Sequence, residues 1–138
     1  MIMKNKYLEE LGLKKGEYGL YDPEKNDKRK KKWKKQRKKF GFDERETWNL
    51  NNTMVEWLYS HLMMYTEIGG KTVDLNYHTF DFNGRMFSEL EAIEFIKEKC
   101  RRYLTFELTD DDMTYDEINA EMTEALHLLA EIFPALWW

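Results

Sequence analysis

The stretch SELEAIEFIKEKCRRYL, residues 88–104, contains both signals that define a helix, a start and a buried side. Ser88 and Glu91 fit a capping box, in which two side chains satisfy free backbone N–H groups at a helix start. The apolar side chains after them recur every three or four residues, which places them on one side of a helix. These side chains are Leu90, Ile93, Ile96, Cys100 and Tyr103. The stretch predicts an amphipathic helix that packs on a core.

The same combination of signals occurs on either side of this stretch. TMVE (Thr53, Glu56) predicts the start of a helix that ends near residue 68, and TYDE (Thr114, Glu117) predicts the start of the last helix. Helical spacing predicts that each helix buries one apolar stripe. The first stripe is Met54, Trp57, Leu58, Leu62, Tyr65 and Ile68, and the second is Ile118, Met122, Leu126, Leu129 and Ile132.

A β-hairpin is predicted between these helices. Asn83-Gly84 separates two aromatic-rich runs in VDLNYHTFDFNGRMF, residues 73–87, and this dipeptide favours a tight turn. A chain of 138 residues, 42% of them hydrophobic, can form one modest core. We therefore expect a mainly α (α+β) fold. It comprises an acidic helical domain with one hairpin, residues 43–138, preceded by an N-terminal segment, residues 1–42, with a basic helical arm.

Charge is distributed unevenly along the chain. Residues 1–42 contain 15 Lys and Arg against 6 Asp and Glu, a net charge of +9, whereas residues 43–138 contain 7 against 20, a net of −13. KRKKKWKKQRKK, residues 28–39, places ten positive charges in twelve residues and is called the basic segment below. Asp22 as N-cap and Pro23 at the first helical position predict a helix that includes this segment and ends at Gly41.

The basic segment is the main functional candidate. Its only apolar side chain is Trp33, so the predicted helix has no stripe to bury, and we expect Trp33 to be exposed and to stack on a base. The favoured partner is a nucleic acid, DNA or RNA, or a nucleoprotein complex. The alternatives are docking on the acidic half of the same or a neighbouring subunit, and a solvated tail without a defined partner. The candidate residues are Lys28, Arg29, Lys30, Lys31, Lys32, Trp33, Lys34, Lys35, Arg37, Lys38 and Lys39.

Two further segments are candidates for a protein partner. TDDDMTYDE, residues 109–117, could mimic a nucleic acid on a basic groove, although acidic residues also gather at a helix start because the helix dipole favours them there. The final FPALWW contains two tryptophans that a small core would leave exposed, which predicts a protein interface and favours a homo-oligomer. The candidate residues are Asp110, Asp111, Asp112, Asp116, Glu117, Trp137 and Trp138.

No motif predicts catalysis. The single Cys100 excludes an internal disulfide framework and a multi-cysteine zinc site. Glu124 and His127 form one E-x-x-H, but a di-iron carboxylate site needs a second copy, which the sequence lacks. We expect no enzyme activity, no metal and no cofactor. The start MIMKNKYLEE lacks a signal-peptide core and no apolar run approaches the roughly 20 residues of a membrane span, so we expect a cytoplasmic protein in a host cell with no membrane partner.

The central part of the chain resembles a group of small phage proteins. GFDERETWNLNNTMVEWLYSHLMMYTE, residues 41–67, and VDLNYHTFDFNG, residues 73–84, are similar to segments of accessory proteins of tailed bacteriophages and prophages. Those proteins share a TWNL segment behind a Lys-rich start, and the resemblance covers roughly residues 28–100. It implies a viral accessory role, for example an anti-CRISPR-like inhibitor of a host nuclease, and it implies no catalytic residue.

Overall fold

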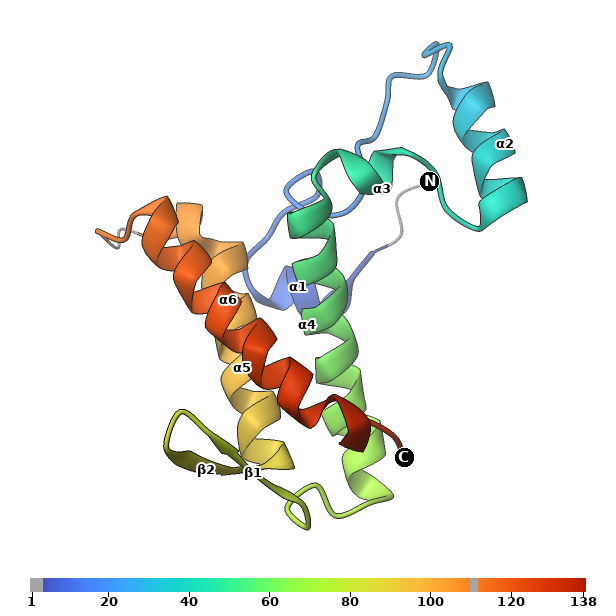
Figure 1. Ribbon diagram of the computed structural model, residues 1–138. Helices are drawn as coiled ribbons and strands as arrows, with labels where there is room; N and C mark the ends of the chain where they lie inside the picture. Colours follow the sequence, from blue (N-terminus) through green and yellow to red (C-terminus); the bar gives the residue numbers. More distant parts are fainter. Residues whose placement is uncertain (1–3, 110–111) are drawn as a thin grey trace. The chain divides into compact units, whose positions relative to one another are not determined.

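The computed structural model describes residues 4–109 and 112–138, and these residues form a mainly helical fold with one two-stranded hairpin (Figure 1). The predicted fold class is confirmed. The chain divides into two compact units, Met1–Trp57 and Leu58–Trp138. Their boundary lies within one helix, α4 (Leu50–Ile68). Among the described residues, no helix has an apolar stretch long enough to cross a bilayer.

The first unit contains three helices before α4 within its described residues: α1 (Lys6–Glu10), α2 (Lys30–Phe40) and α3 (Arg45–Trp48). The side chain of Asn5 caps α1 by accepting a hydrogen bond from the Leu8 N–H at 3.1 Å. Leu8 is buried, and so is Tyr18, whose hydroxyl donates to Glu9 Oε1 at 2.7 Å. A segment in which half of the residues are charged, residues 1–42, therefore also contributes buried side chains.

The helix of the basic segment begins later than predicted. The expected start was Asp22, but α2 begins at Lys30. The carboxylate of Asp27 accepts hydrogen bonds from the Arg29 backbone N–H at 2.9 Å and from the Arg29 guanidinium at 2.7 Å, and this local turn replaces the first predicted helical turns. The predicted end is confirmed. Gly41 has φ 86° and its N–H donates to Arg37 O at 2.9 Å.

The predicted start of α4 is wrong, and its predicted buried side is only partly right, since Leu62 is buried as predicted. Thr53 lies inside the helix, because its N–H donates to Asn49 O at 3.0 Å, and Glu56 instead accepts a hydrogen bond from Gly19 N–H at 3.3 Å. Trp57 is 61% exposed, and Met54 and Ile68 are also exposed. Apolar residues occur on more than one side of this helix, so spacing alone did not identify the buried one. The buried side chains are Val55, Tyr59 and Leu62.

The second unit contains the predicted hairpin. β1 (Thr79–Phe82) and β2 (Arg85–Ser88) pair antiparallel, with Phe80 opposite Phe87. Asn83 and Gly84 form the turn with φ of 51° and 76°, and two positive φ values are what a two-residue turn of type I′ requires. The predicted hairpin and its turn are confirmed.

The core of the second unit lies between α5 (Glu89–Thr105) and α6 (Tyr115–Ile132), which run side by side (Figure 1). Both halves of the predicted capping box form at α5, and the Thr114 side chain accepts from Glu117 N–H at the start of α6. Leu126 is exposed, contrary to prediction, and Ala125 is buried in its place, because a small side chain permits close approach of two helices. The buried residues are Ala92, Ile93, Ile96, Cys100, Ile118, Met122, Ala125, Leu128 and Ile132.

Short 3₁₀ turns follow α4, α5 and α6: η1 (Gly69–Lys71), η2 (Phe106–Leu108) and η3 (Phe133–Ala135). The last residues return to the end of α4. The Tyr65 hydroxyl donates to Trp137 O at 3.2 Å, and the indole of Trp138 lies so close to Gly69 that a Cβ there would stand 2.4 Å from it. Gly69 is therefore required by this contact.

Candidate functional site

Trp33 fixes one side of α2 to the segment that follows it. Its indole is only 2% exposed, and its Nε1–H donates to Glu44 Oε1 at 2.9 Å. The ring centroids of Tyr21 and Trp48 lie 6.4 and 5.7 Å from the Trp33 centroid, both in edge-on arrangements. The prediction that Trp33 is exposed is wrong. The spacing within one helix could not show that its partners come from the loop before the helix and from α3 after it.

Ion pairs surround this buried indole. Lys32 Nζ lies 2.9 Å from Glu44 Oε1, and Arg37 lies 3.2 Å from Glu46. Asp43, 1% exposed, binds Arg45 through two hydrogen bonds of 2.9 and 2.7 Å. The Arg45 guanidinium lowers the pKa of the Asp43 carboxyl, and Lys32 is the main cause of the lowered pKa of Glu44. The cations on the Trp33 side of α2 are therefore largely neutralised within the protein.

Sequence reasoning missed these acidic partners. A signal for them was present, because DERE, residues 43–46, follows the basic segment directly after the left-handed Gly41. A helix end of this type reverses the chain, so the acidic residues return to the side of the helix that holds Trp33.

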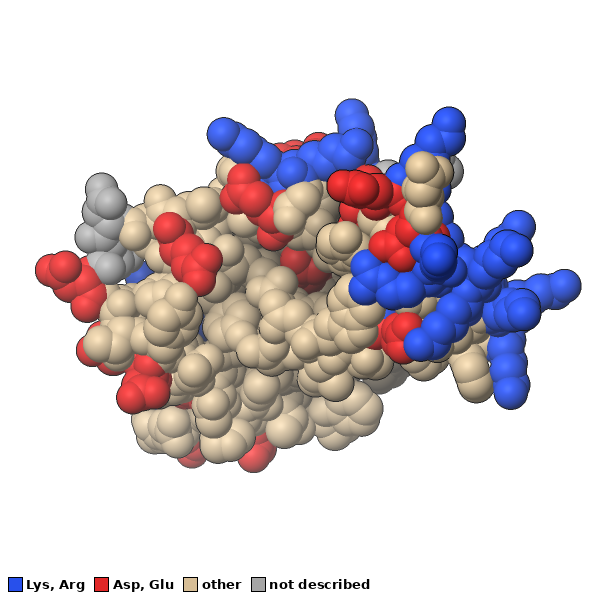
Figure 2. Space-filling model, turned by 90° about the horizontal axis from the view of Figure 1, so that it is seen from above, with Lys and Arg blue, Asp and Glu red and all other residues tan. Residues whose placement is uncertain are grey.

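The opposite side of α2 presents a row of unpaired lysines. Lys31, Lys34, Lys35 and Lys38, called the lysine row below, follow the spacing i, i+3, i+4, i+7. At about 100° per residue Lys31, Lys35 and Lys38 point away from Trp33, and Lys34 lies at the flank of the helix. All four are exposed, and none of their side chains has a hydrogen bond or ion pair within residues 4–109 and 112–138. Figure 2 shows the Lys and Arg side chains at this part of the molecule projecting outward into solvent.

The other cations of the basic segment lie at its ends. Arg29 is bound to Asp27, and its guanidinium carbon is 5.0 Å from the Trp33 centroid. Lys30 Nζ donates to Lys25 O at 3.4 Å, Lys39 Nζ lies 5.1 Å from the Phe40 ring centroid, and Lys28 is exposed. The structure thus separates the candidate residues into an anchoring side and an outward side.

The acidic candidates are only partly described. Asp110 and Asp111 lie outside the described residues. Asp112, Asp116 and Glu117 are exposed, and the last two occupy the first turn of α6, where the helix dipole favours acidic side chains. This position accounts for their charge without a partner.

The terminal tryptophans remain largely exposed. Trp137 is 71% and Trp138 is 54% exposed, although Trp138 contacts Gly69. The prediction that they form a protein interface or a homo-oligomer stays a prediction.

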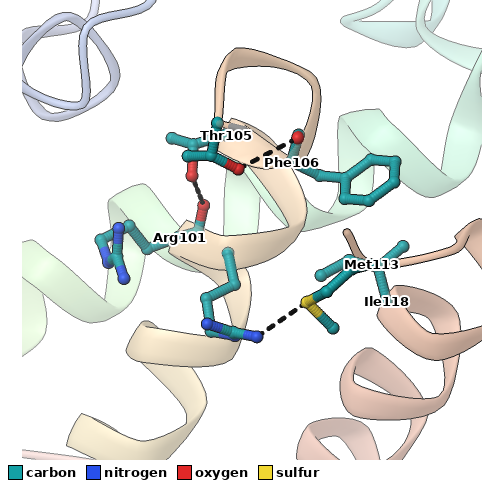
Figure 3. Close-up of a pocket in the computed structure, with 7 residues that line it drawn as sticks. Arg101, Thr105, Phe106, Met113 and Ile118 are labelled. Carbon is teal, nitrogen blue, oxygen red and sulfur yellow. Dashed lines mark hydrogen bonds between the residues drawn. The ribbon is translucent and has the colours of Figure 1, made fainter. Parts of the chain in front are cut away.

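A small cavity lies at the C-terminal end of α5 (Figure 3). Its free volume is about 30 Å³, enough for water but too small for a nucleotide. Arg102 on its wall donates to Met113 Sδ at 2.8 Å and to Glu121 at 3.0 Å, and Arg101 is paired with Glu98. Within the described part of the chain no cluster of three or more His, Cys, Asp or Glu side chains could hold a metal ion. The lining residues are Arg101, Arg102, Thr105, Phe106, Thr109, Met113 and Ile118.

No model of a known protein family matches the chain, and neither a curated protein nor a solved structure matches it. The resemblance of residues 28–100 to phage accessory proteins stays a prediction.

Proposed function

We propose that this protein is a non-enzymatic accessory protein that binds nucleic acid, or a nucleoprotein complex, through α2. One observation carries the proposal. The cations on the Trp33 side of α2 are neutralised by Asp43, Glu44 and Glu46, whereas the lysine row faces solvent without an ion pair among the described residues. Crowded lysines repel one another, so a phosphate backbone would relieve an unfavourable arrangement.

The anchored helix suits this role physically. Lys31 and Lys38 are seven helical steps apart, a rise of about 10 Å, so the lysine row presents four charges over the length of a few phosphates. The buried Trp33 and the ion pairs of Lys32 and Arg37 hold α2 in place. Less conformational entropy is therefore lost when α2 binds than when a flexible tail binds. Lysines neutralise phosphates but do not read base edges, so the proposed binding has little sequence preference.

The resemblance to phage proteins suggests a biological setting for this activity. Within the proposal, a nucleoprotein of host defence such as a CRISPR-type nuclease is a candidate partner. The surface in contact with that partner would again be the lysine row, because its charge suits RNA or DNA held in the complex.

The test replaces Lys31, Lys34, Lys35 and Lys38 with Gln together. Anisotropy measures binding to unrelated labelled duplexes between about 50 and 200 mM salt, where losing about four phosphate contacts should flatten the slope of log K against log salt by about 3–4. In the unmodified protein, these four phosphate contacts alone should lower the affinity by about 10²-fold as the salt rises from about 50 to 200 mM.

The matched control replaces Lys4, Lys14, Lys15 and Lys71 with Gln, which changes the net charge equally at exposed positions outside α2. This control should retain most of the affinity and the salt slope. Equal losses in both variants would mean that only net charge matters. Absence of binding by the unmodified protein at low salt would contradict the proposal itself.

A further inference from the structure

Trp33 belongs to an aromatic cluster with Tyr21 and Trp48, and the other two rings are open to solvent. Tyr21 is 49% and Trp48 is 50% exposed, and their centroids are 6.0 Å apart with ring planes tilted by 46°. Trp33 lies beneath them, edge-on to both rings. One fully buried ring thus supports two rings that are half exposed.

The backbone that carries each exposed ring is held before any ligand binds. Arg45 Nη1 donates to Tyr21 O at 2.8 Å, and the same guanidinium is bound by the buried carboxylate of Asp43. Trp48 is the last residue of α3, and only Asn49 separates it from α4. A ring on such a backbone, packed edge-on to Trp33, loses less freedom than a ring on a flexible tail when a flat ligand stacks on it.

Cations border the aromatic cluster. The guanidinium carbon of Arg29 lies 5.6, 5.0 and 5.8 Å from the centroids of Tyr21, Trp33 and Trp48. Lys25, Lys28 and Lys30 are exposed, and the bond from Lys30 Nζ to Lys25 O brings this loop to the start of α2. Exposed aromatic rings beside several positive charges are the two features with which proteins hold a single strand of nucleic acid.

We infer that Tyr21 and Trp48 form a stacking platform for unpaired bases, so that the ligand of this protein is a single-stranded nucleic acid or a single-stranded segment of a larger complex. The inference rests on the proposed function and adds the class of ligand. Lys25, Lys28 and Lys30 contact the phosphates beside the platform, the lysine row contacts phosphates further along the strand, and the platform takes one or two bases on the exposed parts of its rings. In a duplex the bases are already stacked and paired, so they cannot stack on the platform. The platform therefore raises the affinity for single strands over that for duplexes, which charge alone does not do.

The experiment compares Trp48→Ala and Tyr21→Ala with the conservative variants Trp48→Phe and Tyr21→Phe. The probes are labelled oligo-dT, oligo-U and a DNA hairpin duplex of matched phosphate number. Each alanine variant should weaken binding to both single strands by roughly 5- to 150-fold and leave duplex binding within about twofold, and each phenylalanine variant should retain most of the affinity. The salt slope should not change, because no phosphate contact is removed.

Several outcomes would overturn the inference. Equal losses on single strands and duplex would show that the rings only support α2, and no loss on either would show that bases do not stack there. A phenylalanine variant that binds as weakly as the alanine variant would show that the loss of affinity comes from altered packing around Trp33 and not from a lost stacking surface. These results differ from failure of the proposed function, in which the unmodified protein binds none of the probes. Binding of oligo-dT and oligo-U, measured separately, distinguishes DNA from RNA as the source of the strand.

Discussion

The helices α2 and α5 are held in place in opposite ways. α5 buries a continuous side that includes Ala92, Ile93, Ile96 and Cys100, none of which is accessible to solvent. α2 buries a single side chain, Trp33, and its Lys32 and Arg37 pair with carboxylates. A helix can therefore be anchored by one aromatic residue and a set of ion pairs, which leaves its other side free to carry unpaired charge.

The strongest test of this difference removes the single anchor. Trp33→Ala should cost about 3–5 kcal/mol of the free energy that holds α2 in place, since a buried aromatic is lost and no other residue of α2 is buried. Hydrogen exchange should show loss of protection for the amides of α2, with those of α5 unchanged. Trp33→Phe, which keeps most of the ring, should lose much less protection.

A matched change in α5 completes this comparison. Ile96→Ala should cost about 2–5 kcal/mol and should act cooperatively on α5 and α6, because its neighbours in the stripe remain. If Trp33→Ala left α2 protected, the ion pairs and not the buried aromatic would be the main anchor of α2.

The next largest effect concerns the buried carboxylate beside α2. Asp43→Asn should cost about 1.5–3 kcal/mol, because the charge-assisted hydrogen bonds to Arg45 are lost in a site where Asp43 is almost fully buried. Chemical denaturation followed by hydrogen exchange measures this loss in the first unit. Asp116→Asn, an exposed change in the first turn of α6, is the control and should change stability by less than about 0.5 kcal/mol.

A smaller effect distinguishes a true helix cap from an apparent one. Ser88→Ala should cost about 1 kcal/mol, since it removes both its bond to Glu91 N–H and its bond to Asn76. Thr53→Ala should change stability by less than about 0.5 kcal/mol, because Thr53 lies inside α4 and alanine is the better helix former. Thermal melting measures both. A larger loss for Thr53→Ala would mean that α4 begins at Thr53.

The smallest effect is a pH dependence of opposite sign in the two units. Arg45 lowers the pKa of Asp43, so the stability that Asp43 gives is complete above its ordinary pKa of about 3.9 and is lost as the pH falls towards the lowered value. Burial raises the pKa of Glu89, which faces Tyr65 and His78, so stability is lost as the pH rises above about 4.3. Hydrogen exchange near pH 3 should show α2 weakened relative to pH 7, because this pH lies below the ordinary pKa of Asp43. Glu89→Gln should raise the protection of α5 more at pH 7 than near pH 4, because only the ionised Glu89 carries the cost of burial.

The sequence predicted the parts of the fold that depend on local interactions. The capping box of Ser88, the turn at Asn83-Gly84 and the end of α2 at Gly41 each involve residues within four positions of one another. The TMVE box failed because the same letters fit inside a helix that begins at Leu50. The buried side of α4 was missed because Trp57 and Tyr59 are both large and apolar, and only their tertiary neighbours determine which of them is buried.

The candidate site was predictable in composition but not in geometry. The charge of the basic segment is evident from the sequence, and the lysine row is part of it. The burial of Trp33 depends on Tyr21 and Trp48, which lie on either side of it along the chain and outside its helix. The division into paired and unpaired cations became apparent only when Asp43, Glu44 and Glu46 were located in space.

Cys100 gives the second unit a chemical probe of its own motions. It is the only cysteine of the chain, it is fully buried in α5, and burial raises the pKa of its thiol to about 12. The thiolate is the nucleophile that attacks thiol reagents, so the closed protein should react extremely slowly at neutral pH. The rate of labelling then reports how often α5 and α6 separate, and it does so for this unit alone. No cysteine needs to be introduced, and the first unit, which has none, leaves the signal unchanged.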